Sequence, residues 1–557
     1  MRQYFFIYIL FLLIAGSGQY SIAQTIVVSD IPDIEEQLTI LTDRSIYATN
    51  EEINFRADYS SSADLEKHQT LSSVLYLEII TSEGLPLLQH KYKLSPTGIN
   101  EQITLPESIQ TGQYLIKAYT KWMRNFSPAD YAYCPITIVN PNSKNRIKQE
   151  KICSSGILYK SSESILNLRL NDTIVGKRES VRVSFEQEAH YSNTPHTISV
   201  VRKGAKTDFN FDSIALETQV DSNSTELFYP EINEMVLSGT IVNLATKTGE
   251  ENISLHLTLM NGQPFFAATT SATNGRFYFT LPHLSGIKDF FISADSKDKN
   301  LSINLDGEYC QKPLKICSTD DNKDIQNKSI EQIMINAQLN ARFAINDTIS
   351  SLHKKSNLSF YGSPTRIINT HKYIDLPYIE EFILELIPEF SVYQRRGETI
   401  VKTKEKNTFS PFPVLLLIDN TPVYEKNKFL KIRTNKIETI EIVDRPYLVG
   451  DHKYNGIINA KTAKHDFAGI DLPENSMFFS YQFYTTEKQN EVTKAVTDSR
   501  IPDRRNCLYW NPEFYPKNGT GEFTFSTTDV PGTYQVIIQY LNSKNELITT
   551  TTDFVVQ

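Results

Sequence analysis

The residue types that could do chemistry are dispersed along this sequence and form none of the common catalytic patterns. The ten histidines include no His-Glu-x-x-His string and no two at the i, i+4 spacing with which a helix face holds zinc. There is no Gly-x-Ser-x-Gly elbow and no phosphate-binding glycine loop. The carboxylates of Glu380 and Glu381 could form an acid and base pair, but helical neighbours point to different faces, which favours a solvated helix start. The sequence therefore nominates no catalytic residue, no metal ligand and no cofactor.

The five cysteines allow two interpretations. Cys134, Cys153, Cys310, Cys317 and Cys507 form no Cys-x-x-Cys pair, and their odd number leaves at least one thiol without an intrachain partner. A bridge between Cys310 and Cys317 would suit an oxidising compartment, whereas small buried apolar side chains would suit any compartment. The sequence leaves both interpretations open.

Two aromatic strings contain the residue types of binding hot spots. The first places Trp122, Arg124 and Phe126 near a predicted strand end, where they either contact a partner or close the corner of a sandwich, and the corner is favoured. The second contains Trp510, which either receives a partner or anchors one domain on another, and the interdomain role is favoured.

A basic pair, Arg395-Arg396, stands beside Gly397. It could touch an anionic lipid surface, where two charges contribute only about 2 kcal/mol. The solubility of a turn explains the pair adequately.

The N-terminus has the features of a secretory leader. An apolar run from Tyr4 to Ala15 is too short for a membrane helix, and small and polar residues follow it up to Ala23. Cleavage is expected before Gln24, so residues 1–23 form a signal peptide and the exported chain is peripheral rather than integral to a membrane. With 56 basic and 65 acidic residues, a net charge of −9 and no basic stripe, nucleic acid is a poor partner.

The rest of the chain has the length of several domains and the texture of β proteins. Short runs rich in Thr, Tyr, Phe, Val and Ile alternate with polar clusters, and about 100–200 residues per domain allow three to five domains. Helical patterns occur at 329–344 and 379–386, and Asn274-Gly275 predicts a tight hairpin turn. The predicted units are β-sandwiches at 24–141, 152–230 and 236–310, a helical or irregular connector at 329–374, an α+β domain at 375–466 and a terminal β domain at 500–557.

Three of these segments resemble known domain families. Residues 24–141, with the block Ala-Tyr-Thr-Lys-Trp-Met-Arg-Asn-Phe that begins at Ala118, resemble the macroglobulin-type sandwich of exported Bacteroidota proteins. Residues 236–300 resemble the carboxypeptidase regulatory-like sandwich. Residues 375–466, with Leu-Ile-Asp-Asn-Thr-Pro-Val and Tyr-Asn-Gly-Ile-Ile, resemble the plug domain of TonB-dependent outer-membrane receptors. The plug-like strings contain Asp419 and Tyr454, which join Trp122, Arg124, Phe126 and Trp510 as candidate partner-binding residues.

The chain departs from these families at the features that carry their activities. Only residues 467–557 follow the plug-like segment, too few for a receptor barrel of about 22 strands with about 9–11 residues each. The Cys-x-Glu-Gln thioester string of trapping macroglobulins is missing, and no segment near residue 24 resembles the box that contacts TonB. The resemblance therefore implies neither transport by this chain alone nor covalent trapping of proteases.

The expected fold is mainly β, with tandem immunoglobulin-like or macroglobulin-like sandwiches and a small α+β plug-like domain. The resemblance implies a non-enzymatic binding or scaffold protein in the periplasm or on the periplasmic face of the outer membrane. Its expected partner is an outer-membrane barrel protein, a TonB-dependent receptor or uptake complex to which it is accessory. A secreted or surface-displayed adhesin or glycan-binding protein, an enzyme with an unrecognised site, and a receptor remnant without its barrel stay open as alternatives.

Overall fold

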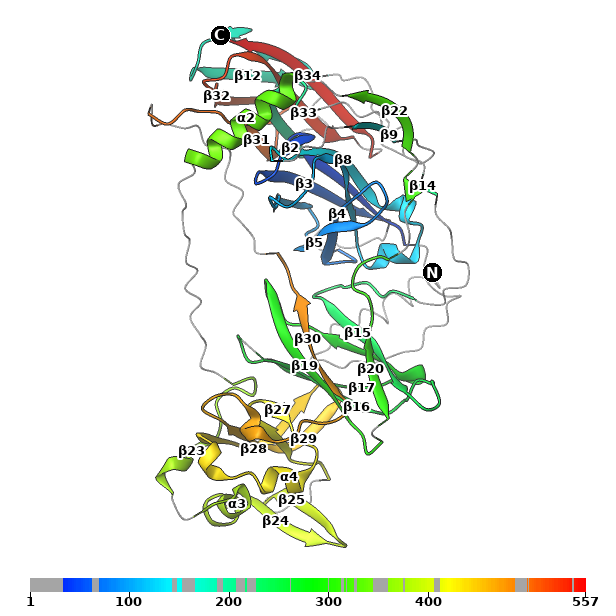
Figure 1. Cartoon of the computed structure of the whole chain (residues 1–557), viewed down its shortest axis with the longest axis vertical. Helices are drawn as coiled ribbons and strands as arrows, with labels where there is room; N and C mark the ends of the chain where they lie inside the picture. The colour runs from blue at the N-terminus through cyan, green and yellow to red at the C-terminus, as the bar shows by residue number, and fades with distance from the viewer. Residues whose placement is uncertain are drawn as a thin grey trace. The chain divides into compact units, whose positions relative to one another are not determined.

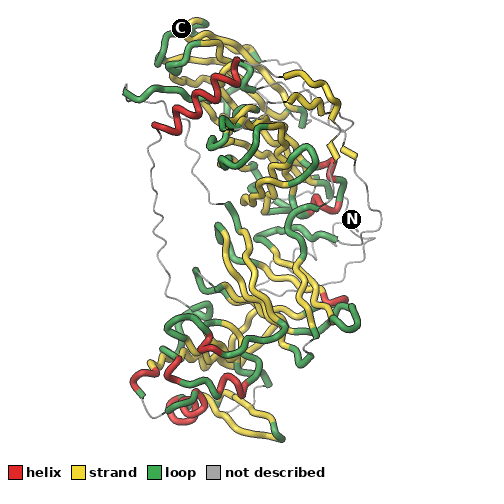
Figure 2. Tube along the Cα trace, in the orientation of Figure 1, coloured by secondary structure: helices red, strands yellow, loops and turns green. Residues whose placement is uncertain are grey.

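The structure of the chain is a computed structural model that divides into two compact units. It describes residues 34–62, 70–142, 148–152, 166–187, 194–206, 216–217, 227–260, 262–298, 300–311, 315–316, 318–324, 328–343, 359–373, 376–404, 411–485, 498, 500–542 and 545–557. The first unit comprises residues 28–233, 309–350 and 484–557, and the second comprises residues 1–27, 234–308 and 351–483. The predicted leader, residues 1–23, lies outside the described residues. Strands dominate both units (Figure 2).

The first unit begins with a β-sandwich at residues 34–142. One sheet has the strand order β1-β3-β6 and the other β2-β8-β7-β4-β5. Apolar side chains from both sheets are buried between them, and the rings of Phe55 and Tyr92, on opposite sheets, meet edge to face at 5.3 Å. The strands are β1 (Glu36–Thr42), β2 (Ile46–Ala48), β3 (Glu52–Ser61), β4 (Val74–Ile80), β5 (Pro86–Lys93), β6 (Ile99–Thr104), β7 (Gly112–Tyr119) and β8 (Ala132–Val139).

A second sandwich in the first unit, the split sandwich, is built from two segments far apart in the sequence. One supplies β10 (Asn167–Leu170), β11 (Ile174–Val175), β12 (Ser180–Glu186) and β13 (His196–Arg202); the other supplies β31 (Cys507–Phe514), β32 (Thr520–Ser526), β33 (Gly532–Leu541) and β34 (Leu547–Val556). Its sheets have the orders β10-β12-β32 and β11-β34-β33-β13-β31. Figure 1 shows β12 of the first segment among β31, β32, β33 and β34 of the second.

The split sandwich corrects two predicted domain boundaries. β12 pairs along its length with β32, and β13 lies between β31 and β33. A single core contains Val183 and Phe185 from one segment and Phe523 and Ile538 from the other. The prediction of separate domains at 152–230 and 500–557 is therefore wrong, because each segment holds only half of the strands that cover this core.

Helix α2 (Lys328–Phe343) joins the two sandwiches of the first unit and confirms the helix expected at 329–344. Its Ile330 and Ile333 pack into a cluster with Ile46 and Val139 of the first sandwich. The same cluster includes residues of the split sandwich, namely Val201, Ala205, Cys507, Trp510 and Ile537. The predicted connector at 329–374 is thus only partly a connector, since its start is a packed helix and residues 366–369 form a strand of the α+β domain.

The second unit begins with a further sandwich, the inserted sandwich. Its sheets have the orders β18-β15-β20 and β17-β16-β19-β30. The last strand comes from beyond the predicted end at residue 310, because β30 pairs with β19. The strands are β15 (Val236–Asn243), β16 (Ser254–Leu259), β17 (Phe266–Thr270), β18 (Arg276–Thr280), β19 (Ile287–Asp295), β20 (Leu301–Leu305) and β30 (Ser476–Gln482).

The Asn274-Gly275 turn has the expected backbone but a different role. Both residues have positive φ angles, 60° and 74°. The strands on either side, β17 and β18, belong to different sheets, so the turn is an arch between sheets and the hairpin prediction is wrong. A Cβ atom at Gly275 would lie 2.2 Å from the carbonyl oxygen of Ile241, which excludes any larger residue.

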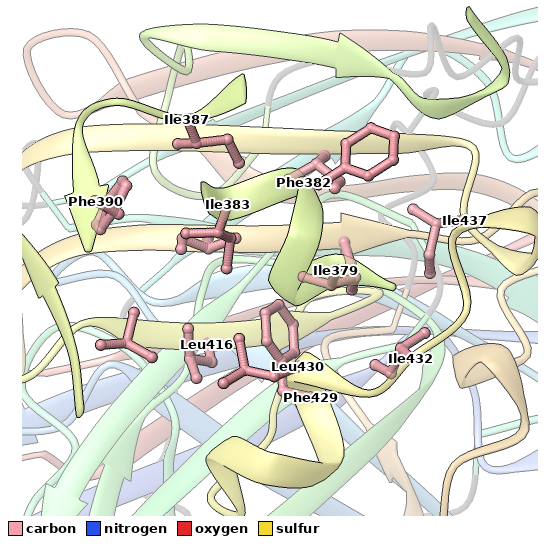
Figure 3. Packing of buried hydrophobic residues seen from close by; sticks show 14 of the residues in the cluster. Ile379, Phe382, Ile383, Ile387, Phe390, Leu416, Phe429, Leu430, Ile432 and Ile437 are labelled. Atoms are coloured by element: carbon pink, nitrogen blue, oxygen red, sulfur yellow. The ribbon is translucent and has the colours of Figure 1, made fainter. Parts of the chain in front are cut away.

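The α+β domain occupies residues 359–470 of the second unit and has the sheet order β23-β28-β29-β26-β27. Helix α3 is where the sequence predicts it, and its Ile379, Phe382 and Ile383 pack against Leu416 and Phe429 in the core (Figure 3). A separate hairpin, β24 with β25, extends from the domain (Figure 1). The elements are β23 (Arg366–Asn369), α3 (Ile379–Leu386), β24 (Phe390–Arg395), β25 (Glu398–Thr403), β26 (Leu415–Ile418), β27 (Thr421–Pro422), α4 (Lys426–Leu430), β28 (Thr439–Val449) and β29 (His452–Lys461).

The architecture confirms the predicted fold class, a mainly β chain with tandem sandwiches and a small α+β domain. Two short ribbons complete the first unit, β9 (Lys148–Ile152) with β22 (Ser318–Asp324) and β14 (Leu216–Glu217) with β21 (Lys315–Ile316). Cys310 is a buried free thiol, which agrees with the interpretation of this cysteine as a small buried apolar side chain. In the described part of the chain, no helix combines the length and apolar character needed to cross a membrane.

Candidate functional site

A group of buried titratable side chains surrounds His256, where the inserted sandwich meets the α+β domain. His256 lies on β16 with only 3 % of its surface exposed. Its Nε2 lies 2.6 Å from the hydroxyl oxygen of Tyr454 on β29, and its Nδ1 lies 2.8 Å from that of Tyr424. The Tyr424 hydroxyl is also 2.7 Å from the Ser293 hydroxyl on β19. Both ring nitrogens of His256 are therefore satisfied by the neighbouring domain.

Close backbone contact brings these side chains together. Gly450, at the tip of the β28–β29 hairpin, has a φ of +55°, and a Cβ atom there would lie 1.9 Å from the carbonyl oxygen of Ala268 on β17. The Thr258 hydroxyl donates to the Asn420 carbonyl at 3.3 Å. The two domains of the second unit thus share a buried junction, which we call the His256 junction.

The chemistry of the His256 junction is structural rather than catalytic. Burial, and then the neighbouring His452, lowers the pKa of His256 to about 3. Burial raises the pKa of Tyr454 above its ordinary value. An imidazole that stays neutral at physiological pH, with both nitrogens engaged and almost no exposed surface, has no free lone pair to offer a substrate. The junction therefore fixes two domains in one geometry.

Tyr454 and Asp419, the two candidates from the plug-like strings, are both internal. Tyr454 belongs to the His256 junction described above. Asp419, on the turn between β26 and β27, is only 6 % exposed. Its carboxylate accepts hydrogen bonds from the Thr462 amide at 2.8 Å, the Thr462 hydroxyl at 2.7 Å and the Phe467 amide at 3.0 Å. Asp419 thus holds the end of β29 to the β26–β27 turn and offers no surface to a partner.

The Trp122 string forms a corner, as favoured from the sequence. Trp122 is buried, its Nε1 donates to the Ile34 carbonyl at 2.8 Å, and its ring meets that of Phe126 edge to face at 6.1 Å. The Arg124 guanidinium lies 3.9 Å from the ring centroid of Phe228, a residue of the same unit. The alternative of an open hot spot is not what the structure shows, because the chain itself covers Trp122 and Arg124.

Trp510 has the favoured interdomain role. It is 3 % exposed and lies in the cluster that joins the first sandwich, the split sandwich and α2. The sequence therefore places the right residue type at a domain junction, but the hot-spot interpretation for a foreign partner is not supported by its position.

The β24–β25 hairpin is an exposed surface that the sequence marks only by its Arg395-Arg396-Gly397 turn. Tyr393 pairs directly with Ile400, and Arg395 pairs with Glu398, so these four side chains share one face of the ribbon. Tyr393 is 40 % exposed, and Arg395 and Glu398 are also exposed. The other face is turned inward, because Thr399 and Val401 are buried. We call Tyr393, Arg395, Glu398 and Ile400 the hairpin face.

The base of the hairpin is well anchored. Phe390 is 1 % exposed and packs in the core of the α+β domain, and the Thr403 hydroxyl donates to the Asn455 carbonyl. At the tip, positive φ angles of 51° at Arg396 and 81° at Gly397 fit a two-residue turn that matches the twist of the strands. The hairpin face is thus held in place by the domain that carries it.

No protein-family model and no curated protein matches the sequence. Among solved structures, trypsin-activated alpha-2-macroglobulin from Escherichia coli aligns over 94 % of this chain and 41 % of its own length, with 8 % identity and a TM-score of 0.23. A Salmonella alpha-2-macroglobulin mutant aligns over 94 % and 39 %, with 9 % identity and a TM-score of 0.23. A teleost fish polymeric Ig receptor ectodomain aligns over 30 % and 69 %, with 12 % identity and a TM-score of 0.14.

The chain therefore spans about two fifths of the length of the bacterial macroglobulins. At these TM-scores the similarity carries no argument about its function. Within the described residues, no group of three His, Cys, Asp or Glu side chains is placed to hold a metal ion.

Proposed function

We propose that this chain is a non-catalytic binding protein of the bacterial cell envelope, accessory to an outer-membrane receptor or uptake complex. The observation that carries the proposal is the hairpin face, an anchored and exposed surface on the domain whose sequence resembles a receptor plug. Tyrosine and arginine are the residue types enriched at binding hot spots, and both project from this face.

The hairpin face suits binding because little conformational entropy is lost when a partner docks. Its strands are paired before binding, and Tyr393 is restrained by its cross-strand neighbour Ile400. Arg395 and Glu398 supply one charge of each sign beside the aromatic ring, which favours a partner surface with polar groups around an apolar centre. A pre-formed ribbon of this kind binds a protein surface more readily than a small molecule.

The envelope location and the type of partner come from the sequence. The predicted leader directs the chain out of the cytoplasm. The plug-like strings favour a barrel protein as the partner, since a receptor plug acts together with a barrel. We therefore place the chain on the periplasmic side of the outer membrane.

The test is capture of the partner from crosslinked native membranes with a tagged chain. The double variant Tyr393→Ala, Arg395→Glu removes the aromatic and inverts the charge of the hairpin face. Leu448→Ala is the matched control, because Leu448 is 67 % exposed in the same domain but lies outside that face.

A hot spot contributes about 2 kcal/mol or more, so capture of the barrel protein should fall more than about tenfold in the double variant and stay unchanged in the control. Recovery of no barrel protein, or equal capture by both variants, would contradict the proposal.

A further inference from the structure

The outer strand of the inserted sandwich, β30, has features that most sheet edges avoid. In the described part of the chain, β30 is the last strand of the sheet β17-β16-β19-β30. Its sequence, Ser-Met-Phe-Phe-Ser-Tyr-Gln, contains no charged residue and no proline. Natural proteins usually protect an edge of this length with a lysine, a proline or a bulge, because an unprotected edge pairs with other strands. The β5, β23 and β31 edges of this chain each carry a proline or a charge, and the β17 and β20 edges, which carry neither, have only five residues each.

The aromatic side chains of β30 are only half covered by their own chain. Phe478 packs against Phe291 of β19 at 4.7 Å, yet 54 % of its surface is exposed. On the opposite face of the strand, Phe479 stacks on Phe290 at 5.7 Å and is also incompletely buried. The Phe478 ring also has Phe467 as a neighbour, with 6.5 Å between the ring centroids, and its exposed surface is what these two rings leave uncovered. A further strand beside β30 would cover more of both rings.

We propose that the occupant of this edge is a second copy of β30, paired antiparallel so that two inserted sandwiches share one continuous sheet. Pairing of all seven residues places Phe479 on the two-fold axis, opposite its own copy. In each copy Phe479 stacks on Phe290. The pairing brings the two Phe479 rings together, so that one row of four rings crosses the axis. The same register sets Phe478 of each copy opposite Ser480 of the other copy.

Shape and charge both favour this occupant. The exposed Phe478 ring meets a small serine at each of the two equivalent positions, so large and small side chains alternate across the axis. At a two-fold interface, a charged residue near the axis lies close to the same residue of the second copy, and the two repel each other. β30 contains no charged residue, so this repulsion does not arise. A strand from a different protein would gain the backbone pairing but not this self-complementary register. The proposal goes beyond the proposed function and does not depend on the hairpin face.

The experiment measures the mass of the purified full-length exported chain by light scattering during size-exclusion chromatography. Phe478→Glu and Ser480→Lys each place a charge at the axis. Ile367→Glu is the matched control, since Ile367 is 57 % exposed on β23, an edge strand of the α+β domain's five-stranded sheet. The wild type and the control should elute at twice the mass of one chain, and each β30 variant at the mass of one chain.

Mixing the two β30 variants gives the sharpest outcome. In the mixed pair the carboxylate introduced at position 478 of one chain faces the ammonium group introduced at position 480 of the other. The second equivalent position keeps the natural Phe478 and Ser480, so the double mass should return. Dimers that persist in the single variants, or a mixture that stays at the mass of one chain, overturn the register. A wild type that has the mass of one chain at every concentration overturns the proposal.

Hydrogen exchange provides a readout that needs no variant. Dilution of the wild type should speed amide exchange in β30 at least tenfold relative to β16, an inner strand of the same sheet. Equal exchange in concentrated and dilute samples overturns the proposal, and so does capture of a foreign strand by a wild type that never dimerises.

Discussion

Nε2 of His256 lies 2.6 Å from the hydroxyl oxygen of Tyr454, and this contact ties the inserted sandwich to the α+β domain. Tyr454→Phe removes only the hydroxyl and leaves a buried ring nitrogen without its partner. The free energy of unfolding of the second unit should fall by about 1–3 kcal/mol. Urea unfolding followed by circular dichroism measures this, with the exposed Tyr393→Phe as control. Equal midpoints for the two variants would show that the contact does not stabilise the junction.

Two buried histidines should make stability fall at mildly acidic pH. Burial lowers the pKa of His256 to about 3 and that of His196 to about 4, both below the ordinary value of 6.5. The stability of the folded chain is not reduced by these histidines above pH 6.5, because neither the folded nor the unfolded chain then binds the proton. Below pH 6.5 the unfolded chain binds protons at these histidines and the folded chain does not. Each histidine should therefore lower the free energy of unfolding by about 1.4 kcal/mol for each pH unit of acidification. The loss continues down to the folded pKa of each histidine.

The measurement is urea unfolding at pH 7, 6 and 5 for the wild type and for His256→Gln. The carboxylates titrate in both proteins, so the difference between them isolates His256. The variant is expected to be less stable at pH 7 and to lose less stability on acidification. Parallel curves for the two proteins would refute a neutral buried His256.

The split sandwich should not form without the C-terminal segment. A chain that ends at residue 485 leaves β12 without β32 and β13 without both of its neighbours. Residues 166–206 should then be cut rapidly by protease, and a co-expressed fragment 500–557 should restore protection. The prediction fails if the truncated chain keeps this segment protected, or if fragment 500–557 alone gives a dispersed NMR spectrum.

Trp510 should be among the most sensitive positions of the first unit. It is 3 % exposed within the cluster that includes Ile46, Val201 and Ile333 from three different elements. Trp510→Ala should lower the free energy of unfolding of the first unit by about 3–5 kcal/mol, because it leaves a large cavity. Tyr515→Ala, at a position 45 % exposed, is the control and should change stability little. A cost as small as that of the control would mean that the cluster does not join the domains.

Local features are predictable from the sequence because they depend on neighbouring residues. Helix α3 falls at residues 379–386 as expected, since the spacing of Ile379, Phe382 and Ile383 marks one buried helix face. The turn at Asn274-Gly275 has the positive φ angles that its residues favour. The corner role of Trp122 and the interdomain role of Trp510 also follow from bulky aromatic residues at predicted element ends.

Long-range pairing cannot be predicted from the same information. Alternation along β12 and β32 shows that each strand has one buried face, but it does not identify the neighbouring strand across more than 300 residues. The His256 junction escapes prediction for a similar reason, because His256 and Tyr454 lie 198 residues apart and neither stands in a motif for the contact. The resemblance to a plug predicts partner contacts for Asp419 and Tyr454, whereas the side chains of both residues serve the fold.

The most direct test of the central proposal is site-specific photo-crosslinking in native cells, with the photoreactive residue at position 393 on the hairpin face or at position 448 as control. The proposal predicts that the chain fractionates with the outer membrane, is protected from added protease, and crosslinks from position 393 to a membrane barrel protein. Position 448 should give no such product. A chain found outside intact cells, open to protease and without a barrel adduct at position 393, would contradict the proposal and favour adhesion or glycan binding instead.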